Sequence, residues 1–469
     1  MMPGIIGCGA YIPLYRLGKE TRGWEAAVEK AIAGFDEDSL TMAVAAVSDC
    51  LGGRDRSLVD ALFFASTTSP YEEKMAAATV AVACDLRPDI VTSDYANSLR
   101  SGSVALRAAL DAVRAGSARQ VVVVTSDLRV PKPGSEFEGV FGDGAAAFLV
   151  GDSGIAAEVE DGYAVSDEIL DMWRPAGDRF VQTWEERFIL DEGYLNVLAE
   201  TVRTFWERKS VSAEDFDKVV LYAPEARRHR DMTSKLGLKA EQVQVPMFDR
   251  LGNTGTAAAP LMLIAALEDA KPGESILYAS YGNGADVMAL RATEDIAKVR
   301  GRRGLGFHLD SKRIMGDYMR YLQWRGLAEL RGGGRRPPPT TPSASAIWRE
   351  RRDNIGFYGV KCNNCGYRQY PSQRICTVCH TKDSFDPVRF AEVKGELFTY
   401  SLDYTTPHPN RPMSIGVVNF EGGGRALLFL TDYEEKDLKV GIPLEMSFRE
   451  MHYVGGMHNY SWKAALVRG

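Results

Sequence analysis

A repeated alternation of apolar strand-like runs with helix-like segments constrains the fold of residues 1–300 most strongly. The run VVVVTSD, around the expected strand Gln120–Ser126, is almost continuously apolar. Such a run is typical of a parallel strand that is covered on both faces. Further strands are expected at Ala61–Thr67 and Lys218–Ala223. Alternation of this kind predicts a layered α/β fold.

Helix-like segments and a weak internal repeat support the same fold. The expected helices lie between the strands at Ser39–Leu51, Glu73–Leu86 and Leu99–Gly116. A glycine-rich turn leads into a strand twice, in FGDGAAAFLVGD (141–152) and in YGNGADVMALR (281–291). Because repeats recur at matching places, we expect a duplicated domain with halves at about 1–160 and 161–300.

Composition and charge exclude several classes of protein. Of the 469 residues, 45% are hydrophobic and 25% are charged, which is the mixture of a folded chain rather than a disordered one. The net charge of −7 makes a nucleic-acid binder a poor interpretation. No apolar run approaches the roughly 18–20 residues that span a bilayer, and the first residues show no signal-peptide pattern. We therefore expect neither nucleic acid nor a membrane among the partners.

Four of the seven cysteines lie within residues 362–379. Cys362, Cys365, Cys376 and Cys379 form two CxxC pairs separated by ten residues, a spacing that suits four thiolates around a tetrahedral Zn²⁺. Four protein ligands leave no open position, so the predicted zinc is structural. Reduced core cysteines and a redox dithiol are the alternative interpretations. Clustered cysteines of this kind favour a reducing compartment, and we expect the cytoplasm.

The chain after residue 300 divides into three expected parts. Residues 301–345 are expected to form a helical extension and then a linker, RGGGRRPPPTTPSAS, which is rich in Gly and Pro. The zinc ribbon is expected at 346–390, and a small barrel of the OB type at 391–469. Five short strands predict this barrel: Glu396–Asp403, Met413–Phe420, Arg425–Asp432, Pro443–Arg449 and Tyr460–Val467.

The order CNNCGYRQYPSQRICTVC followed by five strands resembles the zinc-ribbon/OB-fold modules that accompany thiolase-type acyl-CoA enzymes. The resemblance extends over residues 346–469. It implies an adaptor that contacts a thiolase-fold subunit and helps to shape acyl-CoA sites.

The large domain resembles the archaeal-type hydroxymethylglutaryl-CoA synthases. The resemblance rests on GIIGCGAYIPLYRL, on MWRP with a later Tyr194, on LGNTGTAAAP and on YGNG, which together span residues 4–295. It implies a duplicated thiolase fold with five α/β/α/β/α layers, commonly a dimer. Its sites lie where helices meet strand ends, so helix dipoles can hold an anion.

Most of the side chains that the synthase reaction uses are absent from the matching positions of this chain. Such a synthase uses a cysteine nucleophile, a histidine with an asparagine at the thioester oxygen, and a glutamate that moves protons. These positions fall on Leu99, on Tyr222 with a retained Asn253, and on Thr67. Asn253 and Tyr222 are therefore the candidate catalytic residues, with Tyr95 as a second tyrosine. A tyrosine pKa near ~10 suits a hydrogen-bond donor better than a base.

Basic residues that follow the histidine position meet the CoA phosphates in this family. Arg227 and Arg230 match those positions, with Arg228 between them, and guanidinium groups are strong phosphate partners. They are the candidate CoA-binding residues, and a charged, exposed helix face is the alternative interpretation.

Three functions stay open. The first is aldol, retro-aldol or Claisen-type chemistry on a CoA thioester without a cysteine acyl-enzyme. The second is a synthase-like acyltransferase whose nucleophile lies elsewhere. The third is a catalytically silent subunit that scaffolds an active thiolase through its zinc-ribbon/OB domain. The expected partners are acyl-CoA and either a second copy of the chain or a thiolase-type subunit.

Overall fold

The computed structural model describes residues 2–330 and 339–468, so residues 331–338 of the expected linker lie outside the described part. No helix within it is long and apolar enough to cross a lipid bilayer. The chain divides into two compact units, which we treat separately. The first unit comprises Met1–Ala33, Asp38–Ala81 and Leu86–Gly316, and the second comprises Gly34–Glu37, Val82–Asp85 and Asp317–Gly469.

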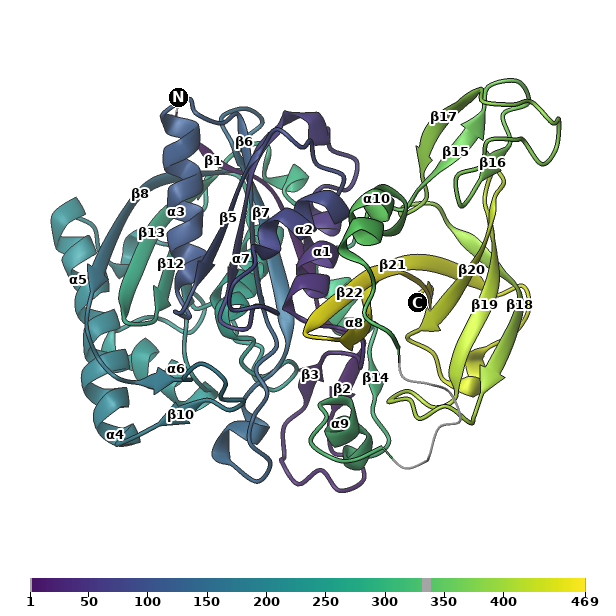
Figure 1. The fold of residues 1–469 in the computed structure, drawn as a ribbon. Helices are drawn as coiled ribbons and strands as arrows, with labels where there is room; N and C mark the ends of the chain where they lie inside the picture. The colour runs from purple at the N-terminus through teal and green to yellow at the C-terminus, as the bar shows by residue number, and fades with distance from the viewer. Residues whose placement is uncertain (1, 331–338, 469) are drawn as a thin grey trace. The chain divides into compact units, whose positions relative to one another are not determined.

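A nine-stranded mixed sheet forms the framework of the first unit (Figure 1), in the order β11-β12-β13-β8-β1-β7-β6-β4-β5. Counted outward from the β1–β8 junction, each half presents two antiparallel pairings and then a parallel one. This shared order confirms the expected duplication of the fold. The strands are β1 (Gly4–Tyr11), β4 (Val59–Ser66), β5 (Val91–Ala96), β6 (Gln120–Asp127), β7 (Gly144–Gly151), β8 (Ala157–Ser166), β11 (Lys218–Leu221), β12 (Ser275–Tyr281) and β13 (Gly284–Ala292).

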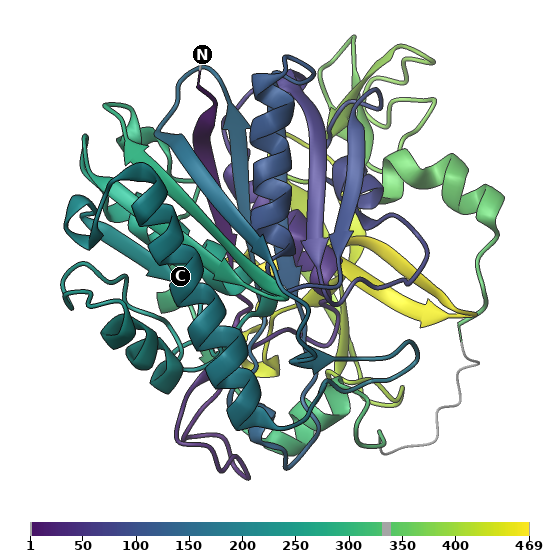
Figure 2. The same ribbon diagram turned by 90° about the vertical axis from the view of Figure 1, so that its left-hand side faces the viewer.

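The two halves of the sheet face each other across a central helix layer. Helix α7 (Ala258–Asp269) contacts β1 and β7 as well as β11 and β12. Helix α3 (Ser101–Arg114) packs on β4 and β6, and its axis runs along these strands (Figure 2). Helix α5 (Leu198–Lys209) covers the outer face of the second half, and α1 (Ser39–Cys50) with α2 (Ala76–Ala83) covers that of the first. These five layers confirm the thiolase-type fold.

Helix α3 begins two residues later than the sequence predicts. Asn97 adopts a left-handed conformation with φ 66°, and the hydroxyl of Ser98 donates to the carbonyl of Gly282. Leu99 consequently lies in the turn that precedes the helix rather than in its first turn. This turn brings Leu99 to the candidate site.

A closed five-stranded barrel, β18-β19-β20-β22-β21, and a three-stranded ribbon, β16-β15-β17, dominate the second unit. All five expected barrel strands are present, and the last two form a longer hairpin than predicted. The elements are α10 (Ala344–Asn354), β15 (Tyr358–Cys362), β16 (Arg368–Gln369), β17 (Phe385–Arg389), β18 (Gly395–Asp403), β19 (Met413–Phe420), β20 (Arg425–Thr431), β21 (Pro443–Val454) and β22 (Met457–Leu466).

A buried ionic network also lies in the second unit. The Arg449 side chain is 1% exposed and pairs with Glu37 at 2.5 Å and with Asp432 at 2.7 Å. Lys463 pairs with Asp36 at 2.9 Å. Three acids therefore face three bases, so the buried charge is balanced: Asp36, Glu37 and Asp432 with Arg449, Lys463 and Arg468.

Short elements complete the chain. The short helical elements are α8 (Leu305–Asp310), α9 (Tyr318–Trp324) and 3₁₀ turns that include Arg56–Leu58, Ala213–Asp215, Ile296–Lys298 and Glu435–Asp437. The short strands of the first unit are β2 (Tyr15–Leu17), β3 (Lys30–Ile32), β9 (Met172–Trp173), β10 (Gln182–Thr183) and β14 (Arg313–Ile314).

Candidate active site

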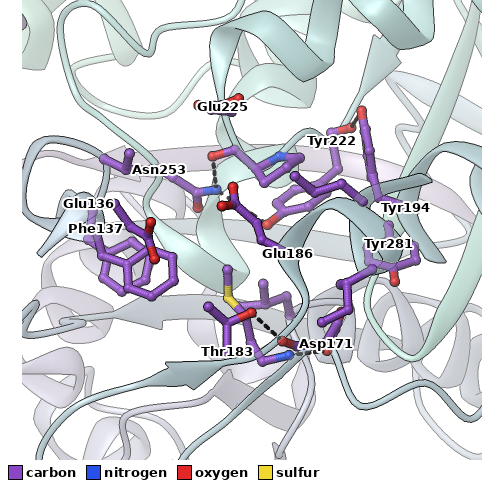
Figure 3. Close-up of a pocket in the computed structure, with 17 residues that line it drawn as sticks. Glu136, Phe137, Asp171, Thr183, Glu186, Tyr194, Tyr222, Glu225, Asn253 and Tyr281 are labelled. Carbon is purple, nitrogen blue, oxygen red and sulfur yellow. Dashed lines mark hydrogen bonds between the residues drawn. The ribbon is translucent and has the colours of Figure 1, made fainter. Parts of the chain in front are cut away.

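A pocket of about 850 Å³, counting the part open to solvent, lies in the first unit (Figure 3). Its walls come from the turn before α3, from the connections that follow β6 and β8, and from the segments around α6 (Ala226–Lys235) and α7. The lining is Leu99, Glu136, Phe137, Val140, Phe141, Asp171, Met172, Thr183, Glu186, Ile189, Leu190, Tyr194, Tyr222, Pro224, Glu225, Asn253 and Tyr281.

The two candidate catalytic residues, Tyr222 and Asn253, meet in this pocket. The Asn253 amide donates to the Tyr222 hydroxyl at 3.3 Å and to the Pro224 carbonyl at 3.0 Å. Its oxygen accepts from the amide of Gly255 at 2.9 Å, which fixes the orientation of the side chain. Because the Tyr222 oxygen accepts this bond, its own O–H is left to donate elsewhere, and no acceptor for it lies among the described residues.

The phenol of Tyr222 is held in its protonated form. Burial raises the pKa of Tyr222, while the neighbouring Arg129 guanidinium and the Asn253 hydrogen bond lower it, and the balance lies above the ordinary value. The side chain is 2% exposed. Tyr222 is therefore suited to donating a hydrogen bond and not to removing a proton.

A tyrosine cluster packs around Tyr222. The rings of Tyr194 and Tyr281 meet edge to face at 5.6 Å, and the Tyr194 hydroxyl donates to the main-chain carbonyl of Tyr222 at 2.8 Å. Tyr194 lies on a π-helix, η3 (Ile189–Val197), which follows the short helix α4 (Glu186–Phe188). A π-helix is rare and is found frequently at functional sites. A Cβ at Gly193 of this helix would lie 2.6 Å from the Tyr281 hydroxyl, so the close packing requires glycine.

Asp171 is the most enclosed carboxylate of the lining, and the sequence analysis does not select it. It precedes β9, and its Oδ1 accepts from the amide of Met172 at 2.5 Å. Burial raises the pKa of Asp171, although the hydrogen bond from the Met172 amide lowers it. Burial and the Asp171 carboxylate raise the pKa of Tyr281 in turn. A carboxylate with a raised pKa next to a phenol can accept a proton near neutral pH.

Arg129 is a second residue that the sequence analysis misses. Its guanidinium stacks on the Phe141 ring at 3.8 Å and donates to the Met172 sulfur, so it lies directly behind two lining residues. Arg129 is 4% exposed, and its Nη1 has no hydrogen-bond partner among the described residues. One signal could have found it, because it follows the carboxyl end of a buried parallel strand, where ligand sites of α/β sheets lie.

The four clustered cysteines meet the requirements of zinc in the second unit. Their sulfur atoms lie within 4.8 Å of one another, and the Cys362–Cys379 and Cys365–Cys376 pairs are each separated by 3.6 Å. A tetrahedron with Zn–S bonds of about 2.3 Å has edges of about 3.8 Å. The residues present therefore fit a structural zinc.

Known proteins resemble both units. Residues 206–292 match the family described as 3-Oxoacyl-[acyl-carrier-protein (ACP)] synthase III C terminal, and residues 388–449 match the ChsH2, C-terminal OB-fold domain. The hydroxymethylglutaryl-CoA synthase of Aeropyrum pernix is 33% identical over 346 residues, which are 70% of this chain and 95% of that protein. The chain belongs to the hydroxymethylglutaryl-CoA synthase family.

Solved structures of the same fold agree with this assignment. An HMG-CoA synthase complexed with CoA matches with a TM-score of 0.62 at 20% identity, over 73% of this chain and 96% of that one. MvaS in complex with 3-hydroxy-3-methylglutaryl coenzyme A matches with a TM-score of 0.60 at 18% identity, over 71% and 94%. The likeness to these two establishes the fold.

Thr67 and Tyr95, two further residues that the sequence analysis selects, lie outside the pocket lining. The Thr67 hydroxyl donates to the Asp127 carboxylate at 3.0 Å, and Asp127 also accepts from Ser66, Thr68 and the amide of Thr256. Thr67 thus belongs to a structural hydrogen-bond cluster. Tyr95, the second candidate tyrosine, packs against the ring of Phe63 instead, with the centroids at 5.5 Å.

The candidate CoA-binding arginines lie on α6. Arg227 and Arg230 are exposed, and neither forms an ion pair within the described residues. Arg228 between them pairs with Asp231 at 3.2 Å. Pro224 and Glu225, which directly precede α6, line the pocket, so both free guanidinium groups are carried by the helix that begins at the pocket wall.

Proposed function

We propose that this chain binds an acyl-CoA thioester in the pocket and makes or breaks the bond between C2 and C3 of the acyl group by aldol or retro-aldol chemistry. The supporting observation is Leu99, an apolar side chain that lines the pocket together with Tyr222 and Asn253. By the resemblance, it occupies the position at which the synthase family carries its nucleophile. Because leucine forms no thioester, the reaction proceeds on the bound CoA thioester without a covalent acyl-enzyme.

Tyr222 donates its free O–H to the thioester oxygen, which becomes negatively charged when the enolate forms. Preorganised donors of this kind stabilise developing charge without reorganisation. Asn253 is a positioning residue in this proposal, because its amide already donates to Tyr222 and to Pro224.

Asp171 is the proposed base. In the retro-aldol direction it accepts the proton of the 3-hydroxyl group, the C2–C3 bond breaks, and a carbonyl compound leaves. The electron pair of that bond forms the enolate of the shorter acyl-CoA. Protonated Asp171 then returns the proton to C2, so the step consumes no further reactant. The aldol direction reverses these events.

The remaining residues of the proposal bind the CoA part of the substrate or stabilise the fold. Arg227 and Arg230 are the proposed partners of the CoA phosphates. A zinc ion held by the four cysteines is proposed as a structural element of the second unit and takes no part in the chemistry. Reduced cysteine ligands support the cytoplasm as the proposed location of the protein. The proposed partner is either a second copy of the chain or a thiolase-type subunit.

The test combines a mass measurement with a product assay. The protein is incubated with acetyl-CoA and with acetoacetyl-CoA, and the intact mass is recorded. It is then incubated with 3-hydroxy-3-methylpentanoyl-CoA, which would give acetyl-CoA and butanone. We expect no acyl adduct and the release of both products. An adduct on the wild-type protein would overturn the proposal and would favour a synthase whose nucleophile lies elsewhere.

The second unit favours another candidate function. Its barrel matches the OB-fold domain of ChsH2, which supports a role as a catalytically silent subunit that scaffolds an active thiolase. In that case the chain alone would release no butanone. A complex reconstituted with a cysteine-bearing thiolase would be active, and the Tyr222→Phe variant would leave its activity unchanged.

A further inference from the structure

We propose that the pocket selects an uncharged, apolar acyl group and rejects acyl groups that end in a free carboxylate. This inference rests on the proposed binding of an acyl-CoA and names the class of acyl group. It separates the chain from a protein whose ligand is 3-hydroxy-3-methylglutaryl-CoA, because that acyl group carries a terminal carboxylate.

The charge of the lining is the first observation. Four lining side chains are carboxylates, and none of the residues that the structure assigns to the lining is a lysine or an arginine: the acids are Glu136, Asp171, Glu186 and Glu225. Glu136 and Glu186 are exposed and form no ion pair within the described part of the chain. Glu225 has a cationic partner outside the lining, Arg228 at 3.9 Å. An acyl carboxylate in this pocket would therefore meet more negative than positive charge.

The apolar wall is the second observation. Leu99, Val140, Met172, Ile189 and Leu190 line the same space. Burying an apolar acyl group against such side chains is favourable, at about 25 cal/mol per Å² of apolar surface. Burying a carboxylate there is costly unless it is paired. Polar recognition is concentrated at Tyr222, whose free O–H is suited to one uncharged oxygen of the ligand.

The buried guanidinium of Arg129 lies directly behind the lining and is a group that could attract an anion. Phe141 and Met172 cover it on the pocket side. Asp127 and Asp171 act on its charge, and so does a second base, Arg174, so two acids face two bases. The charge of Arg129 is therefore compensated by neighbouring groups of the protein, and no net positive charge is left for a ligand carboxylate.

Two ligands that differ only in the charged group test this selectivity. In 3-hydroxy-3-methylpentanoyl-CoA a methyl group replaces the carboxylate of 3-hydroxy-3-methylglutaryl-CoA. Dissociation constants are measured by calorimetry for both ligands and for free CoA. Two unit charges about 8 Å apart at an effective dielectric constant of about 20 repel each other enough to weaken binding roughly thirtyfold. We expect the uncharged ligand to bind at least about tenfold more tightly, since exposed charges are partly screened.

Matched variants test whether the carboxylates of the lining cause the preference for the uncharged ligand. The double variant Glu136→Gln/Glu186→Gln removes two exposed charges of the pocket, and we expect the tenfold preference to shrink to about threefold or less, since only the more enclosed acids remain. Glu200→Gln removes an exposed charge from α5 outside the pocket and should leave the preference unchanged.

The outcomes are distinguishable. Equal affinities for the two acyl-CoAs, both above that of free CoA, would overturn the selectivity and leave the proposed function standing. Tighter binding of the charged ligand would also overturn it and would assign Arg129 to the carboxylate. Absence of binding for both acyl-CoAs and for CoA would overturn the selectivity together with the proposed function.

Discussion

Replacing Tyr222 by phenylalanine removes one oxygen and leaves the rest of the pocket in place. The Asn253 amide loses its 3.3 Å bond to the hydroxyl but keeps the carbonyls of Pro224 at 3.0 Å and Ala223 at 3.3 Å. The Tyr194 bond to the main-chain carbonyl of Tyr222 does not involve the lost atom. The fold should therefore persist, with a loss of stability of at most about 1.5 kcal/mol.

The catalytic effect should be much larger than the effect on stability. Removing one donor from an oxyanion site typically lowers kcat by about 10²–10³, or roughly 2.7–4 kcal/mol. The donor acts on the charge that develops in the transition state, so KM should change little. We expect this pattern for the release of butanone from 3-hydroxy-3-methylpentanoyl-CoA.

The assay compares kcat, KM and thermal unfolding of the wild type, Tyr222→Phe and Tyr278→Phe. Tyr278 is a buried tyrosine of β12 outside the pocket lining, and its variant should retain the wild-type kcat. A Tyr222→Phe variant with kcat within about threefold of the wild type would refute the role of the phenol, because a lost donor costs far more than that.

The pH profile supplies an independent check. Asp171 must be ionised to accept the proton, and its pKa is raised, so kcat should fall with acid at a pH above the ordinary aspartate range. Tyr222 must be protonated, and its pKa is raised as well, so activity should persist to alkaline pH. An acid limb that stays in place in Asp171→Asn would contradict the assignment of the base.

Further predictions concern the other parts of the molecule. The double variant Arg227→Gln/Arg230→Gln should weaken CoA binding by about tenfold and flatten its dependence on salt, as a calorimetric titration in two salt concentrations would reveal, because each guanidinium-phosphate contact is charge-assisted. Cys376→Ser should lower the bound zinc measured by elemental analysis and lower the thermal stability of the second unit; an unchanged zinc content would refute the ligand set. Arg449→Ala should cost about 3–5 kcal/mol of unfolding free energy in a denaturant titration, since it leaves buried carboxylates unpaired; a loss below about 1 kcal/mol would show that the network is dispensable.

Features that depend on residues close together in the chain could be predicted from the sequence. Contacts between residues that only long-range packing brings together could not. The zinc ligands lie within 18 residues and follow from spacing alone, as do the barrel strands and the alternation that gives the layered sheet. The resemblance also predicts that Leu99, Tyr222 and Thr67 stand where the synthase family carries its reactive groups.

Only the tertiary structure decided which side chains face one another. Asp171 and Arg129 lie in connections between regular elements, where no period of two or 3.6 predicts the direction of a side chain. The hydrogen bond from Asn253 to Tyr222 joins residues 31 positions apart. In the proposed function this bond makes Asn253 a positioning residue rather than the oxyanion donor that the resemblance implies. Tyr95, the second candidate tyrosine, packs on Phe63 outside the pocket lining. The physical reason is that packing between separate elements, which local propensity does not encode, selects the side chains that enclose the pocket.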